Sequence, residues 1–139
     1  MLTESQRQFL SANHNAAVTT FRRNGAAQMS IVTCGLYGDG VAFTTTVHRA
    51  KLRNLRRDPR CTIMVGTENW RDFLVLEGEA RLVGVENSSA DEYRETLRDV
   101  FRTAAGQEHS NWPEYDQAML DDRRYAVIVT PSNVYGRTG

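Results

Sequence analysis

The feature that most constrains the fold is a series of three strand-like segments separated by tight turns. Residues 15–22, 28–37 and 41–47 are rich in β-branched and aromatic side chains. Between them stand Asn24-Gly25 and Gly38-Asp39-Gly40, which are typical of hairpin turns because their residues tolerate positive φ. Three strands joined by two short turns predict an antiparallel meander, and therefore a mainly β domain.

The rest of the chain alternates helical and extended patterns. Helices are expected over residues 3–13, 49–58, 88–105 and 111–120, with Thr3 and Gln6 at capping-box spacing and Gly106 as a stop. Further strands are expected over residues 61–65, 73–85 and 125–129, with Pro131 ending the last and extended chain resuming at 133–136. A bulge is expected near Gly78. Six or seven largely antiparallel strands with three or four helices predict a small closed barrel.

Composition bounds the function. We expect a single domain over residues 1–139, and the formal net charge of zero argues against a general nucleic-acid binder. The sequence has no apolar run of a transmembrane length and no signal-peptide core, so we expect neither. Cys34 and Cys61 lie in apolar runs without CxxC spacing, which indicates buried thiols in a reducing cytoplasm.

The stretch 44–60 (TTTVHRAKLRNLRRDPR) is the candidate binding motif. Three threonines end a strand and a short helix follows, and the stretch carries six cationic side chains. The first N–H groups of a helix lack intrahelical partners and carry partial positive charge. With Arg49 and Lys51 in the first turn, this junction predicts a phosphate or carboxylate site. The side chain of Thr45 should point opposite to those of Thr44 and Thr46.

The sequence lacks the residue patterns of other common catalytic mechanisms. His14, His48 and His109 show no metal-ligand spacing, and no phosphate-binding glycine motif or nucleophile elbow is present. Glu77 and Glu79 alternate along a strand, which is typical of an exposed face rather than a pair of acid catalysts. If the protein is an enzyme, a cofactor carries the reaction.

Three segments carry a family resemblance. They are HRAKLRNLRRDPR (48–60), EHSNWPEYDQAMLDDRR (108–124) and SNVYG (132–136). Together with the order of elements, they resemble the pyridoxamine 5'-phosphate oxidase-like FMN-binding split barrels, and more narrowly the actinobacterial branch that uses the deazaflavin coenzyme F420. The resemblance implies a six- to seven-stranded antiparallel split barrel that forms a homodimer, with two cofactor sites at the dimer interface.

The resemblance also implies site residues. The cofactor phosphate would lie against the end of the third strand and the basic helix, and the ring against the second strand, with an aromatic residue of the partner subunit closing the site. Carried onto this sequence, these are Thr44, Thr45, Thr46, Arg49, Lys51 and Asn54 for the phosphate, Gln28, Ser30 and Val32 for the ring, and Trp70 for the closing aromatic.

Structural roles are the alternative for several of these residues. Trp70 could instead cover the barrel end, and Thr45 could be an ordinary strand residue. We interpret Arg53, Arg56, Arg57 and Arg60 as surface residues or dimer ion pairs, and Trp112 and Tyr115 as core residues rather than substrate contacts.

The function implied is hydride transfer from reduced F420 to an unsaturated small molecule, with no residue that must be the catalytic acid. Tyr115 and Tyr135 are candidates for the proton donor. Arginines beyond the phosphate anchor would suit the glutamate tail of F420, since guanidinium pairs with carboxylate. The alternatives are an FMN-dependent flavoprotein of the same fold, a non-catalytic cofactor-binding protein and a haem-binding split barrel.

Overall fold

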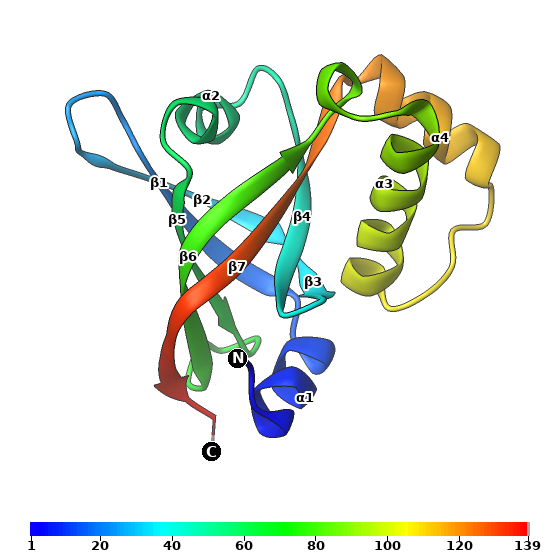
Figure 1. The fold of residues 1–139 in the computed structure, drawn as a ribbon. Coiled ribbons are helices and arrows are strands. Elements are labelled where there is room, and N and C mark those ends of the chain that lie inside the picture. Colours follow the sequence, from blue (N-terminus) through cyan, green and yellow to red (C-terminus); the bar gives the residue numbers. More distant parts are fainter. Residues whose placement is uncertain (139) are drawn as a thin grey trace.

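The molecule is built on one curled antiparallel sheet (Figure 1). The computed structural model describes residues 1–138, and over these the chain forms seven strands in the sheet order β2-β1-β5-β6-β7-β4-β3. The strands are β1 Asn15–Phe21, β2 Ala27–Thr33, β3 Gly35–Tyr37, β4 Gly40–Thr46, β5 Arg60–Gly66, β6 Phe73–Val83 and β7 Arg124–Arg137. The short apolar strand β5 is central, between β1 and β6, as its composition predicts.

The meander prediction is wrong at its middle strand. The predicted strand 28–37 is two strands, β2 and β3, separated only by Cys34 and lying at opposite edges of the sheet. β2 pairs with β1, whereas β3 pairs with β4. A chain that passes from one edge to the other through one residue requires both edges to meet there, so the sheet curls into a barrel. Beyond Cys34 the edges β2 and β4 are not paired among the described residues, and the barrel is split between them.

The predicted break at Pro131 is also wrong. β7 continues through Pro131 to Arg137, and its register against β6 shifts beside Gly78. Glu77 pairs with Asn133 and Gly78 pairs with Pro131, which leaves Ser132 as the extra residue of a bulge. A bulge leaves room for a residue without a backbone N–H, so the proline is tolerated and the expected bulge at Gly78 is confirmed.

Four α-helices complete the fold. They are α1 Glu4–Ala12, α2 Ala50–Arg57, α3 Ala90–Ala105 and α4 Trp112–Asp121, and a 3₁₀ turn η1 spans Val85–Asn87. The capping box at Thr3 and the left-handed Gly106 after α3 are confirmed. Figure 1 shows α3 and α4 together on one flank of the barrel and α1 at the end opposite to α2. No helix in residues 1–138 combines the length and apolarity needed to cross a bilayer.

The sheet separates two apolar cores. Phe43, Ile63 and Leu76 are fully buried in the barrel interior, while Leu97 and Ile128 belong to the layer beneath α3 and α4. Because side chains alternate along a strand, Thr45 shares the interior face of Phe43, and Thr44 and Thr46 share the opposite face. Thr45 is accordingly almost fully buried, and Thr44 and Thr46 are half-buried.

Candidate cofactor-binding site

The predicted phosphate motif borders a cleft in the split of the barrel. The cleft has a volume of about 430 Å³ and lies between the unpaired edges of β2 and β4, with the start of α2 at one end. It is lined by Ser30, Ile31, Val32 and Thr33 of β2, Thr44, Thr45 and Thr46 of β4, and Arg49, Lys51 and Arg124. Seven of the ten residues predicted for the site therefore line one cleft.

The other three predicted residues do not line this cleft. Asn54 donates its amide to Thr20 Oγ1 at 3.1 Å, and the Thr20 hydroxyl donates to Gln28 Oε1 at 3.1 Å. These two bonds tie α2 to β1 and β2, so both amides help to position the helix. Trp70 lies in the β5–β6 loop, at the opposite end of β5 from α2, and packs its ring on Gly66. Its predicted role in the partner's site stays a prediction.

Helix α2 supplies its N-terminus to the cleft. Its N-cap residue, Arg49, makes no side-chain cap, so the first amide N–H groups of the helix have no capping oxygen. Leu52 and Leu55 are buried beneath the helix and fix its orientation. The helix therefore turns Lys51 inward, where only 9% of its surface is exposed, while Arg49 remains exposed at the rim.

Three cations converge on the cleft. Burial lowers the pKa of Lys51, and the positive charges of Arg49 and Arg124 lower it further. Among residues 1–138, no carboxylate lies within ion-pair distance of Arg49 or Lys51, and Arg124 reaches only Asp122, with Nε 3.8 Å from Oδ2. Like charges held together without counter-charges favour the binding of an anion.

The cleft wall also contains two buried polar atoms without partners. Ser30 Oγ and Arg124 Nε make no hydrogen bond to the described residues. Leaving a buried donor unsatisfied costs roughly 1–3 kcal/mol, and such atoms are uncommon in native proteins. Their occurrence in the same cleft fits a site that a ligand completes.

Arg124 is a lining residue that sequence reasoning missed. It is the first residue of β7 and lies opposite Thr46 in the β4–β7 pairing. Its Nη1 donates to Thr44 Oγ1 at 3.2 Å, which fixes the guanidinium beside the strand end. The only sequence signal was an Arg-Arg pair before an apolar strand, and nothing local indicates that this strand pairs with β4.

The remaining arginines of the motif are engaged elsewhere. Arg56 donates to the Tyr125 hydroxyl at 2.6 Å, and Arg57 donates to the Phe21 carbonyl at 2.6 Å. Arg60 forms an exposed ion pair with Asp58 at 2.7 Å. Beyond Arg49 and Lys51, Arg53 is therefore the main cation of the motif that is still available to a ligand. It is exposed and bonds the His48 carbonyl through Nη1 alone.

The tyrosines proposed as proton donors lie outside the cleft lining. The buried Tyr115 hydroxyl donates to the Leu97 carbonyl at 2.8 Å, and burial raises its pKa to about 12. Tyr135 lies on the distal part of β7 and is half exposed.

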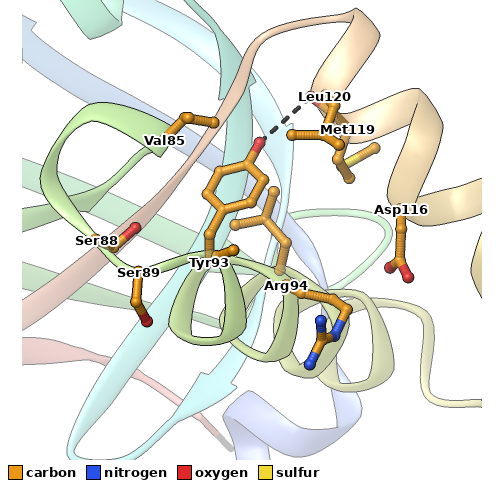
Figure 2. Close-up of a pocket in the computed structure, with 10 residues that line it drawn as sticks. Val85, Ser88, Ser89, Tyr93, Arg94, Asp116, Met119 and Leu120 are labelled. Atoms are coloured by element: carbon orange, nitrogen blue, oxygen red, sulfur yellow. Dashed lines mark hydrogen bonds between the residues drawn. The ribbon is translucent and has the colours of Figure 1, made fainter.

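A second cavity lies between η1, α3 and α4 (Figure 2). It has a volume of about 250 Å³ and mainly apolar walls. Its polar groups are paired: the Tyr93 hydroxyl donates to the Arg124 carbonyl at 2.6 Å, Asp116 binds Arg98, and Arg94 binds Asp91. Because it offers no unpaired cation, this cavity does not suit a phosphate.

A curled antiparallel sheet that is open along one side, with a cationic cleft at the opening, is a split barrel. Residues 2–137 match the family model described as pyridoxamine 5'-phosphate oxidase, and the chain belongs to that family of flavin-dependent oxidoreductases.

Solved structures share the fold at low identity. The conserved hypothetical protein Rv2991 from Mycobacterium tuberculosis is 16% identical, with a TM-score of 0.77 over 99% of this chain and 85% of its own. An F420 reductase is 18% identical, with a TM-score of 0.64 over 96% of this chain and 98% of its own. General Stress Protein 26 from Bacillus anthracis is 12% identical, with a TM-score of 0.63 over 96% of this chain and 92% of its own.

Proposed function

We propose that this protein is an F420-dependent oxidoreductase that reduces an unsaturated small molecule. The observation that carries the proposal is the convergence of Arg49, Lys51 and Arg124 on a cleft that contains no neutralising carboxylate for the first two. The three charges and the uncapped start of α2 suit a phosphate group. The family membership supports a flavin-type cofactor, and one structural neighbour is an F420 reductase.

Different residues of the chain would bind different parts of such a cofactor. Lys51 and the first N–H groups of α2 would hold the phosphate inside the cleft, and Thr46 lies beside them. Arg53 is exposed on α2 and has donors to spare, so it would pair with a carboxylate of the F420 tail. The apolar side chain of Val32, which shares the inward face of β2 with Ser30, would pack on the ring.

When bound, reduced F420 supplies a hydride from C5 to an electrophilic carbon of the acceptor. The acceptor then needs one proton, which we assign to water because the Tyr115 hydroxyl is buried and occupied by the Leu97 carbonyl. The task of the protein is to orient the acceptor against the cofactor.

A homodimer is part of the proposal. β2 is an edge strand of the sheet, and it exposes 63% of Met29 and 70% of Ile31. An edge strand with exposed apolar side chains is a surface that another chain can cover. Sedimentation velocity tests this arrangement: a monomer that binds the cofactor with full affinity would contradict it.

FMN is the second candidate cofactor, and a specific observation favours it. Arg56, Arg57 and Arg60 are engaged by Tyr125, Phe21 and Asp58, so fewer cations remain for a polyanionic tail than the sequence suggests. A single phosphate would be satisfied by Arg49, Lys51 and Arg124.

Parallel fluorescence titrations with F420 and FMN, at low and moderate salt, separate the two. Tight binding of F420 with weak binding of FMN supports the proposal, and consumption of reduced F420 by a panel of enones supports turnover. Preference for FMN would move the chemistry to a flavin. Tight F420 binding without turnover on any acceptor would favour a carrier.

A further inference from the structure

An apolar crevice adjoins the cofactor cleft. It has a volume of about 360 Å³ and lies between the edges of the sheet and the α3–α4 layer. Thr33, Thr44 and Arg124 line both the cleft and the crevice, so the two spaces adjoin at these three residues. A molecule in the crevice would therefore lie next to the wall of the cofactor cleft.

The crevice differs from the cleft in chemical character. Its deeper wall is formed by apolar side chains of α3 and α4, including Phe101, Ala104 and Met119. The Tyr115 ring also lines it, but its hydroxyl is turned away to the Leu97 carbonyl. The crevice therefore offers a surface for apolar contact with few free donors.

The charges at the crevice select against anions. Asp122 lies at the exposed rim, and Arg124 lies at the junction with the cleft. Arg124 Nη1 already donates to Thr44 Oγ1, and in the proposed function the charge of Arg124 is used by the cofactor phosphate. A carboxylate or phosphate entering the crevice would meet the charge of Asp122 and would lose its hydration without a free cation.

We propose that this crevice seats the hydride acceptor, and that the acceptor is an uncharged, largely apolar molecule. The inference rests on the proposed function, because the cofactor cleft fixes where the reaction takes place. Its volume lies within the range of ordinary small-molecule sites and suits a compound of one or two rings.

The cavity of Figure 2 is the competing location, and it provides a matched control. It is apolar as well, and it lies at the other end of α3, but it shares no lining residue with the cofactor cleft. Ala90 lines this cavity, whereas Ala104 and Ala105 line the crevice. Enlarging one alanine at a time therefore fills one apolar space and leaves the other open.

Methionine methyl groups report the location directly. Of the four methionines, only Met119 lines the crevice, while Met29 and Met64 lie on β2 and β5 as internal references. Protein labelled with ¹³C at the methionine methyls and loaded with oxidised F420 is titrated with cyclohex-2-en-1-one, which cannot react in this state. We expect the Met119 resonance to shift, and 3-oxocyclohex-1-ene-1-carboxylate to cause a much smaller shift.

Met119 lines the cavity of Figure 2 as well as the crevice, so a shift of its resonance alone does not identify which space is occupied. Variants that fill one space at a time identify it. Ala104→Phe should abolish the response and Ala90→Phe should preserve it. Ala105→Phe, at an exposed lining position, serves if Ala104→Phe fails to fold. In turnover with reduced F420, the crevice variant should raise the KM for cyclohexenone by at least about tenfold with unchanged F420 affinity.

The opposite pattern, a response lost in Ala90→Phe and retained in Ala104→Phe, would overturn the proposal, as would equal binding of the carboxylated analogue. An unresponsive Met119 in protein that binds F420 would overturn the crevice assignment alone. Failure of the fluorescence titration to show F420 binding would instead refute the proposed function.

Discussion

Lys51 should dominate the affinity for the cofactor, and the comparison with Arg56 on the same helix tests this. Lys51 is buried in the cleft without a carboxylate partner, whereas Arg56 is exposed and occupied by Tyr125 through a 2.6 Å hydrogen bond and a cation–π contact of 4.8 Å. A hydrogen bond to a charged group contributes about 1.5–3 kcal/mol. At about 1.4 kcal/mol per tenfold change, Lys51→Ala should weaken cofactor binding by about 10- to 150-fold.

The burial of Lys51, which favours cofactor binding, should reduce the stability of the cofactor-free protein. The pKa of Lys51 is lowered, first by desolvation and then by Arg49 and Arg124, so its charged form is disfavoured by folding. Lys51→Met, which keeps the apolar stem, should therefore leave the cofactor-free protein equally stable or more stable at neutral pH. Wild-type stability should rise relative to this variant as pH increases through the lowered pKa of Lys51.

Fluorescence titration gives the affinities, and urea unfolding without cofactor gives the stabilities. Arg56→Ala should lower stability through the lost Tyr125 contacts and change cofactor affinity by less than about threefold. Equal losses of affinity in Lys51→Ala and Arg56→Ala would refute the reasoning, because the two changes remove the same charge from the same helix.

Three further predictions concern the frame around the site. Gly35→Ala should destabilise the protein by at least about 1–3 kcal/mol in urea unfolding, because its Cβ would clash with the main chain of α3 at Thr103. The Arg98 guanidinium lowers the pKa of Asp116, so this pair contributes stability above the ordinary pKa of an aspartate and loses it as pH falls through the lowered value. Asp116→Asn should therefore cost stability at pH 6 and little near pH 2 in the same assay, and an equal cost at both pH values would contradict the assignment. Burial raises the pKa values of Cys34 and Cys61 to about 12, so a thiol reagent should label neither in the native protein and both after unfolding, and rapid native labelling would show that they are accessible.

Elements set by local chemistry could be predicted from the sequence. The β1–β2 hairpin follows from Asn24-Gly25, and α1 follows from the capping box at Thr3. The part of the candidate site at the end of β4 and the start of α2 follows in the same way, since these residues and Lys51 are neighbours in sequence.

Features that depend on pairing between distant strands could not be predicted from the sequence. Both halves of the segment 28–37 favour extended chain, so nothing local marks Cys34 as the point where one strand leaves the sheet edge for the other. Arg124 reaches the cleft only because β7 pairs with β4 in a register that places it opposite Thr46. The engagement of Arg56 by Tyr125 is likewise a contact between residues far apart in the chain.

Cys34 is the single residue between β2 and β3, so the number of residues at this point sets how β2 is placed beside the cleft. One added residue would introduce about 3.3 Å of chain and turn the side chains of one strand to the opposite face. Met29 and Ile31 would exchange places with Ser30 and Val32, and Ser30 and Val32 would no longer face the cleft. Insertions should therefore be tolerated at the Asn24-Gly25 tip and rejected at Cys34, so the spacing between the two halves of the binding cleft is encoded in the number of residues rather than in their identity.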